Sequence, residues 1–397
     1  MIIAIFTTTI SLLLSLFLTK KILAPSTVVS AIWFFCILAF CLYPHGYVKL
    51  NEQFYIAISL WVGFFSFFSL LRQSISIRER HTTEPAKVVR DIYFIIALIS
   101  FPLSVWSVFS IIQDYGLSGH IYSALRDIAI GNVRGLEEGI SNNYFATLWL
   151  VAYCIELVHY NKKNLARILI LFAINFGWAF LVMAKMNFLN LLISTLTILF
   201  FKNVIKPKVI YISLAVVFAF FTFIQVIRTV GAEDKDDLKY DFFSQYVISG
   251  MPAFEKIKPS SSEYFGQSSF RFFYKVANKL GISSKTPEDA LQPFTNVGKT
   301  KPSHTNVYTT LYPFFKDFGY LGVIIFGALT GLLYGYLYKG LINSNYPFFV
   351  TYAILGTSLF IQFMSDNTLS TLSFVIQIII FSHLPYWTTK LFQKTKI

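Results

Sequence analysis

The longest polar stretch of the chain, Val230 to Gly322, holds a histidine whose surroundings suit acid–base chemistry. His304 lies shortly before an apolar run, beside Thr305 and Asn306, whose side chains could orient its ring by hydrogen bonding. Histidine is the natural general base near neutral pH. The alternative is a loop histidine with no role, because a single histidine without a defined partner is not a motif.

The same stretch contains a predicted helix with a basic face, from about Ser268 to Leu280, with Gly281 as its C-terminal cap. Three basic residues four positions apart share one side of it: Arg271, Lys275 and Lys279. Another side is apolar and consists of Phe273, Val276 and Leu280. The basic side could clamp a lipid diphosphate, contact anionic headgroups or simply face water.

Arginines suited to phosphate lie in a second polar segment, Gln113 to Ser141. Arg126 and Arg134 stand among glycines there, and the planar guanidinium group matches phosphate oxygens in a way that lysine does not. Arg228 and Lys185 are predicted to point to the same side of the molecule. Each of these two side chains could instead extend to the membrane interface without a functional role.

Carboxylates open the long polar stretch and offer an alternative base or metal site at Asp234, Asp236 and Asp237. We prefer to interpret them as the acidic start of an amphipathic helix, because apolar residues from Leu238 to Phe254 recur every three or four positions and no histidine accompanies the carboxylates. This helix is expected to lie on the membrane surface or on the bundle of spans.

Composition excludes a soluble domain. The chain has 397 residues, of which 55% are hydrophobic and 13% charged, whereas soluble proteins carry roughly 25% charged residues. Repeated apolar runs of about 20 residues predict an all-α, polytopic integral membrane protein. Eleven spans are expected, at about 2–19, 25–44, 53–71, 92–112, 142–159, 165–184, 188–201, 209–230, 320–338, 346–364 and 369–387. The predicted regions are 1–230 with spans one to eight and a smaller loop 113–141, the large loop 231–319, and 320–397 with the last three spans and a tail.

Charge distribution predicts the orientation. The net charge of +13 arises from basic residues that separate apolar runs, so it indicates topology and not nucleic-acid binding. The odd-numbered connections and the C-terminus carry most of these residues, which places the N-terminus outside and the C-terminus in the cytoplasm. Cys36, Cys41 and Cys154 all lie in apolar runs, and we predict neither a disulfide nor a metal site from them.

With this organisation the chain resembles the bacterial oligosaccharide repeat-unit polymerases, the Wzy-type O-antigen polymerases. The resemblance rests on many spans with two outer loops and on the basic turn Ala184-Lys185-Met186-Asn187 before an apolar span. Its strongest elements are Thr305-Asn306-Val307-Tyr308-Thr309-Thr310 and Lys316-Asp317-Phe318-Gly319-Tyr320-Leu321-Gly322. As organisation it covers the whole chain, and as motif about 40 residues.

The resemblance implies a fold related to membrane glycosyltransferases that use lipid-linked sugars and to O-antigen ligases. It implies polymerisation of undecaprenyl-diphosphate-linked repeat units into O-antigen or a similar surface polysaccharide at the periplasmic face of the bacterial inner membrane. The N-terminus would be periplasmic. No cofactor and no metal would be needed, and a chain-length regulator and a flippase are expected partners besides membrane lipid.

The site residues follow from the same resemblance. Diphosphate binding is carried onto Arg126, Arg134 and Arg271, with Lys185 and Arg228 as further cations, and the loop histidine of the related ligases onto His304. Asn306, Asp317 and Tyr308 would orient the base or the sugar, although Asp317 could instead cap the ninth span. Lysine at 185, where relatives often carry arginine, is a departure.

Two rival functions share parts of this pattern. A lipid-linked oligosaccharide flippase or another transporter would need polar residues within its spans, which here are poor in charge except for Glu156 beside His159. An O-antigen ligase shares the lipid donor and the fold, and only its acceptor, lipid A core, distinguishes it.

Overall fold

The computed structural model of the chain is mostly helical, with few strands. It describes residues 1–75, 84–114, 142–182, 184–209, 212–213, 243–288, 292–300 and 302–394. Among these, seven helices are long and apolar enough to cross a membrane, and three shorter helices are also apolar. The protein is therefore an all-α membrane protein, as the sequence predicts. Most of the eighth predicted span, 209–230, lies outside the described residues.

Two compact units divide the chain, and each is assembled from three segments. The first unit consists of Met1–Arg78, Asp236–Lys339 and Ser358–Val375, and the second of Glu79–Lys235, Gly340–Thr357 and Ile376–Ile397. Three of the described helices run across boundaries between these segments: α12 (Tyr312–Ile342), α14 (Thr357–Phe360) and α15 (Leu372–Lys394).

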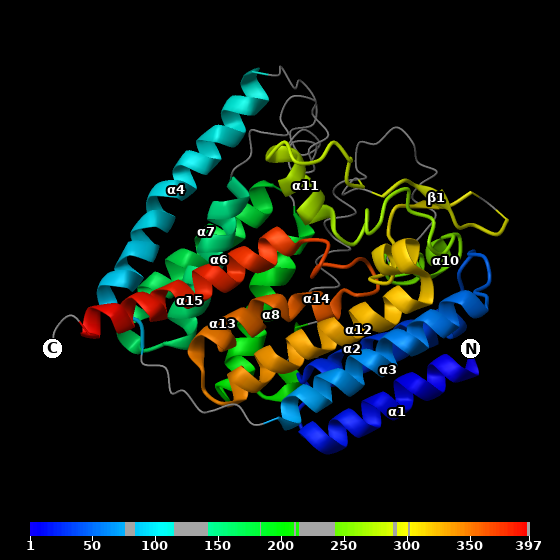
Figure 1. Ribbon diagram of the computed structural model, residues 1–397. Helices are drawn as coiled ribbons and strands as arrows, with labels where there is room; N and C mark the ends of the chain where they lie inside the picture. Colours follow the sequence, from blue (N-terminus) through cyan, green and yellow to red (C-terminus); the bar gives the residue numbers. More distant parts are fainter. Residues whose placement is uncertain are drawn as a thin grey trace. The chain divides into compact units, whose positions relative to one another are not determined.

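The first unit is built on three N-terminal helices that lie side by side (Figure 1). They are α1 (Ile2–Thr19), α2 (Pro25–Leu42) and α3 (Glu52–Ser74). Hydroxyl groups join them: Ser15 Oγ lies 2.6 Å from Ser26 Oγ, and Ser30 Oγ lies 3.2 Å from Ser66 Oγ. Large apolar side chains of α1 stay exposed, as on a helix that faces lipid.

A stripe of glycines lets α12 approach α3 closely. It consists of Gly327, Gly331 and Gly335, which face Trp61, Phe65 and Ser69 of α3. A Cβ atom at Gly335 would lie 2.6 Å from the carbonyl oxygen of Ser69, and one at Gly331 would clash with that of Phe65. Small residues every fourth position are the usual way for two membrane helices to bring their backbones together.

The chain reverses direction at Gly319, inside the segment that forms α12. Gly319 has φ 59° and ψ −145°, which are not helical values. The rings of Phe314 and Phe326 stack at 4.5 Å, whereas twelve residues of straight helix would span about 18 Å. Tyr312 to Phe318 therefore form a short half-helix that folds back along the remainder of α12, with Phe314 also stacked on Trp61 at 5.6 Å.

The predicted tenth span is shorter than expected. Its helices α13 (Tyr346–Leu355) and α14 end at Phe360, and residues 361–371 are not helical. Gln362 in this segment is buried, and its Oε1 accepts hydrogen bonds from the indole N–H groups of Trp33 at 2.9 Å and Trp61 at 3.0 Å. Where hydropathy predicts the last turn of the span, the chain is not helical, and it buries a side-chain amide whose oxygen has two hydrogen-bond donors.

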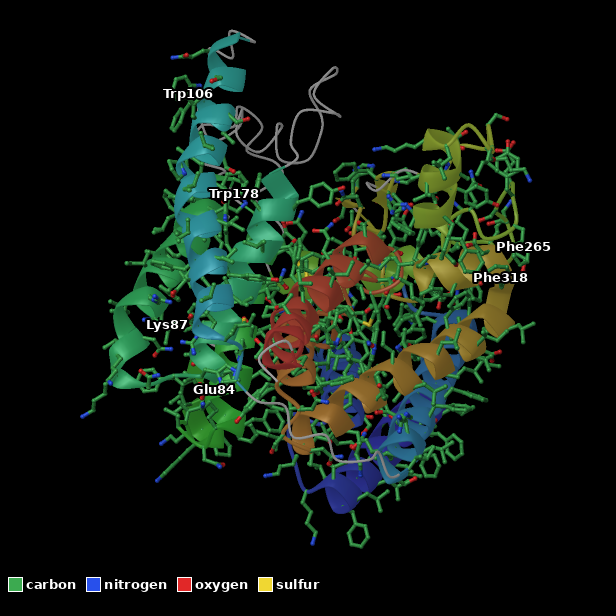
Figure 2. The ribbon with its side chains drawn as sticks, turned by 60° about the vertical axis from the view of Figure 1, so that its left-hand side comes forward. Glu84, Lys87, Trp106, Trp178, Phe265 and Phe318 are labelled. Carbon is green, nitrogen blue, oxygen red and sulfur yellow. The ribbon has the colours of Figure 1, made fainter. Side chains whose placement is uncertain are left out.

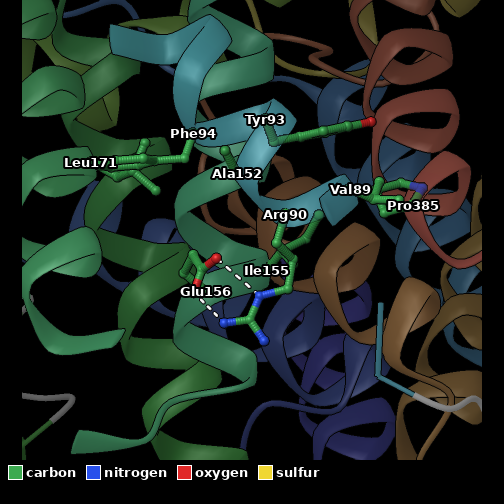
Figure 3. Close-up of a pocket in the computed structure, with 9 residues that line it drawn as sticks. All are labelled: Val89, Arg90, Tyr93, Phe94, Ala152, Ile155, Glu156, Leu171 and Pro385. Carbon is green, nitrogen blue, oxygen red and sulfur yellow. Dashed lines mark hydrogen bonds and ion pairs between the residues drawn. The ribbon is translucent and has the colours of Figure 1, made fainter. Parts of the chain in front are cut away.

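The second unit contains α4 (Lys87–Asp114), α6 (Asn142–Val158), η1 (Lys162–Asn164), α7 (Leu165–Leu181), α8 (Lys185–Phe201), α13 and most of α15. Arg90 of α4 donates to Glu156 of α6 from Nε at 3.0 Å and Nη2 at 2.6 Å (Figure 3). Asn164 donates to the same carboxylate at 2.8 Å. The cavity beside this pair measures about 10 Å³, room for about one water. Glu156, the main charge among the predicted spans, is thus held in a structural ion pair.

Substitution at the reversal tests this description. Gly319→Ala forces a Cβ onto backbone that only glycine adopts freely, and Gly322→Ala drives a Cβ into the carbonyl oxygen of Phe314. We expect each to destabilise the protein, by roughly 1–3 kcal/mol for Gly319→Ala. The control is Gly63→Ala, where the nearest atom is 3.7 Å away. Equal melting temperatures of all three variants in detergent would contradict the folded-back half-helix.

Candidate functional site

The far end of the long polar stretch packs into the helix bundle of the first unit, beside the candidate site residues. Thr305 is buried, and its Oγ1 lies 2.9 Å from Ser249 Oγ. The backbone N–H of Thr310 donates to the carbonyl oxygen of Gln362 at 2.7 Å. Thr309 is fully buried as well. The segment 305–310, the strongest local element of the family resemblance, is therefore largely packed into the bundle and supports the residues on either side of it.

The first helix predicted in the loop is also packed inward. Its described part comprises η3 (Ser244–Ile248) and α10 (Gly250–Phe254). Phe254 is fully buried, with its ring 5.9 Å from that of Phe54 and 4.8 Å from that of Phe315. The sequence predicts this helix either on the membrane surface or on the bundle of spans, and its described residues pack on the bundle.

Glu255, directly after α10, attaches the loop to the beginning of α3. Its Oε1 accepts the backbone N–H groups of Asn51 at 2.9 Å and Phe54 at 3.0 Å. A carboxylate at a helix N-terminus satisfies donors that have no partner within the helix. Burial raises the pKa of the Glu255 carboxyl, and these two hydrogen bonds act against that shift.

Asp317 joins the half-helix of α12 to the turn before α11 (Arg271–Lys279). Its Oδ1 accepts the backbone N–H of Ser268 at 3.2 Å, and its Oδ2 that of Ser269 at 2.6 Å. The hydroxyl of Ser262 donates to Oδ1 as well. Both carboxylate oxygens are thus engaged. The position of α11 depends on this residue, which caps a distant turn and not the span that follows it.

Glu288 is the centre of a second polar cluster beside Asp317. Its Oε1 accepts the hydroxyl of Tyr312 at 2.6 Å and pairs with the ammonium group of Lys316. Its Oε2 accepts the hydroxyl of Ser268. Sequence reasoning missed Glu288, because its partners are 20 to 28 positions away and no spacing relates them. Its one signal is that acidic residues are scarce in this basic part of the loop.

The helix α11 has the two faces that the sequence predicts. It ends where expected, with Gly281 at φ 70° and the N–H of Ile282 donating to the carbonyl oxygen of Ala277 at 2.8 Å. Lys275 and Lys279 are exposed, and Arg271 is half-buried. Among the described elements of the loop, this helix carries the most basic residues, which makes it the candidate element for anion binding.

His304 and its neighbours occupy very different environments. His304 lies in the short strand β2 (His304–Thr305), which pairs with β1 (Thr295–Asn296), and its side chain is exposed. Successive side chains of a strand point to opposite faces. Thr305 therefore points into the bundle and does not orient the histidine ring. Asn306 is half-buried.

Tyr308 contributes a buried ring and not an open sugar-binding surface. Its hydroxyl donates to the carbonyl oxygen of Pro293 at 3.2 Å, and its ring lies 4.7 Å from that of Tyr312. Burial raises the pKa of Tyr308, which keeps the hydroxyl protonated as a donor. Through Tyr312 and Glu288, this contact joins the β1–β2 hairpin to the turn that carries α11.

The remaining predicted site residues belong to the second unit or lie outside the described residues. Lys185, the first residue of α8, belongs to the second unit and is half-buried. Arg126, Arg134 and Arg228 lie outside the described residues, as do the carboxylates from Glu233 to Asp237. Within the part of the chain that the structure describes, no three His, Cys, Asp or Glu residues are grouped as metal ligands.

Comparison of the chain with protein-family models, with curated proteins and with solved structures found no match. A functional interpretation of the loop therefore depends on its own geometry and on the resemblance of its motifs.

The role assigned to Asp317 can be measured directly. Asp317→Ala removes the acceptor for two backbone N–H groups and should release α11, because each hydrogen bond to a charged group contributes about 1.5–3 kcal/mol. We expect faster amide hydrogen exchange over residues 271–279 while exchange in α3 stays unchanged. Glu263→Gln, an exposed carboxylate of the same loop, is the matched control. Unchanged exchange in α11 would contradict the tether.

Proposed function

We propose that this protein transfers a growing glycan from one undecaprenyl-diphosphate carrier to another lipid-linked repeat unit, and so polymerises O-antigen or a similar polysaccharide. The observation that carries the proposal is that a basic helix, α11, is tied by Asp317 to the end of an apolar, membrane-type helix. A lipid diphosphate places its charge at that level, just outside the hydrocarbon of the bilayer. The resemblance to Wzy-type polymerases supports the same substrate.

The chemistry asks little of the protein beyond charge neutralisation and one proton transfer. The anomeric carbon already carries a good leaving group, the lipid diphosphate. As its bond to the diphosphate oxygen breaks, the electron pair passes to the diphosphate, whose negative charge arginine side chains stabilise. The acceptor hydroxyl forms the new glycosidic bond and gives its proton to a general base.

His304 is the proposed base, and its exposed ring on the β1–β2 hairpin is open to an acceptor sugar. Arg271 is the proposed diphosphate ligand of the described loop, together with Arg126 and Arg134 of the smaller loop and with Lys185 and Arg228. Asn306 remains a candidate for sugar contact, because its side chain is half-exposed. Asp317 and Tyr308 are positioning residues in this scheme, since their polar atoms are engaged within the protein.

The proposed setting is the bacterial inner membrane, with the N-terminus and both loops on the periplasmic side and the C-terminus in the cytoplasm. Substrate would arrive through a flippase, and a chain-length regulator would set the extent of polymerisation. An O-antigen ligase would use the same donor and the same cations. The acceptor separates the two activities, because a ligase transfers glycan to lipid A core.

The assignment is tested by glycan length in cells that carry variants at normal protein level. His304→Ala should abolish long chains, because removal of a general base costs about 10²–10⁴-fold in rate. Arg271→Ala and Arg271→Lys should both shorten the chains, with the lysine variant less affected since it keeps the charge. Lys299→Ala, an exposed cation of the same loop, is the control. Full-length polymer from His304→Ala would remove this histidine as the base.

A further inference from the structure

The helix α11 exposes an apolar face, which is not expected of a loop that is surrounded by water. The side chains of Phe273, Val276 and Leu280 are 56%, 40% and 67% exposed. They lie on one side of the helix, and Lys275 and Lys279 lie away from them on its polar side. A short helix with one apolar and one basic face is the pattern of elements that lie in a membrane interface.

An open groove of about 440 Å³ adjoins this face. Its lining is almost entirely apolar and comes from Phe265, Phe270, Phe273, Tyr274, Ala277 and Ser283. The groove offers no charged side chain to a ligand, so its shape and chemistry suit a hydrocarbon chain and not a sugar or a phosphate.

The apolar surface continues onto the outside of α12. Three residues of that helix, four positions apart, are exposed and apolar: Leu321, Ile325 and Leu329. On a membrane-spanning helix such a stripe faces lipid. It begins at Leu321, just after the reversal at Gly319. Phe318, the last residue before that reversal, has its ring 5.0 Å from that of Phe265, a side chain that is 76% exposed (Figure 2). Phe265 and the groove therefore lie next to the first residue of the lipid-facing stripe of α12.

The beginning of α11 is held at this level by two independent contacts. Asp317 binds the backbone of Ser268 and Ser269. The ring of Phe270 packs edge-on against that of Phe326 at 5.8 Å, about two turns beyond Gly319 in the long part of α12. The beginning of α11 therefore lies beside the turns of α12 that follow Gly319.

We propose that α11 is an interfacial membrane helix. Its apolar face and the adjoining groove take acyl chains of anionic phospholipids in the leaflet where the long part of α12 begins. Lys275 and Lys279 contact the phosphates of those lipids, because lysines on the polar face of such a helix reach the headgroups of an anionic surface. The inference concerns bulk lipid and is independent of the glycan transfer proposed above.

Spin labels on the full-length protein in vesicles test the position of α11. Of the three cysteines, Cys41 is the exposed one, so Cys41→Ser provides the background. Labels are attached in Phe273→Cys and Leu280→Cys on the apolar face and in Lys275→Cys on the polar face as the matched control. Vesicles contain phosphatidylethanolamine and phosphatidylglycerol. Collision rates with oxygen, which concentrates in hydrocarbon, are compared with those of a water-soluble nickel chelate.

The two apolar-face labels should favour oxygen several-fold over the control label. Adding Lys279→Glu should shift the Leu280→Cys label toward the nickel chelate in these vesicles and leave it unchanged in pure phosphatidylcholine. Three results would overturn the proposal: equal nickel access for all labels, spin–spin coupling between copies of the chain in place of lipid contact, or the same response to Lys279→Glu in both kinds of vesicle. Every position is exposed, so the variants leave the core intact.

Discussion

The organisation of the outer loop depends on one chain reversal. At Gly319 the backbone adopts φ 59° and ψ −145°, values at which a side chain is strongly disfavoured. The reversal lays Tyr312–Phe318 against the long part of α12, so that Phe314 stacks on both Trp61 and Phe326. It also brings Asp317 to the turn before α11. Without this reversal, the packed far end of the loop and the basic helix α11 would both lose the contacts that fix their positions.

The apolar bundle supplies hydrogen-bond partners to buried polar groups of this polar segment. Gln362 illustrates the principle: its side-chain oxygen accepts two indole N–H groups, and its backbone oxygen accepts the N–H of Thr310. Water is not available to complete such hydrogen bonds inside a bilayer, so irregular backbone is tolerated only where protein supplies the partners. The loop and the bundle of the first unit are in this sense one structure.

Hydropathy and periodicity predict the fold well wherever structure is local. The apolar runs of α1, α2 and α3 and the two faces of α11 with Gly281 at its end appear as expected. The folded-back half-helix was not predicted: the sequence analysis places Tyr312–Phe318 in the large loop, and the stacking of Phe314 on Trp61 joins residues that lie far apart in the sequence. The end of α14 at Phe360 could not be predicted either, because Gln362 beyond it is held by Trp33 and Trp61, which lie far away in the sequence.

The candidate site is predictable to a lesser degree. Its charged groups could be chosen by type, since histidine and arginine suit the chemistry, but their surroundings depend on contacts between distant residues. Asp317 and Tyr308 are engaged with groups that no spacing identifies. Glu288 was missed entirely for the same reason.

Reconstitution of the protein in lipid vesicles measures repeat-unit polymerisation directly. The purified protein in proteoliposomes receives undecaprenyl-diphosphate-linked repeat units of one defined structure as the only glycan. A polymerase should give a ladder of lipid-linked products that differ by whole repeat units, with release of undecaprenyl diphosphate in equal number to the bonds formed. Failure to form any product longer than one repeat, with transfer appearing only when lipid A core is supplied, would contradict the proposed polymerisation.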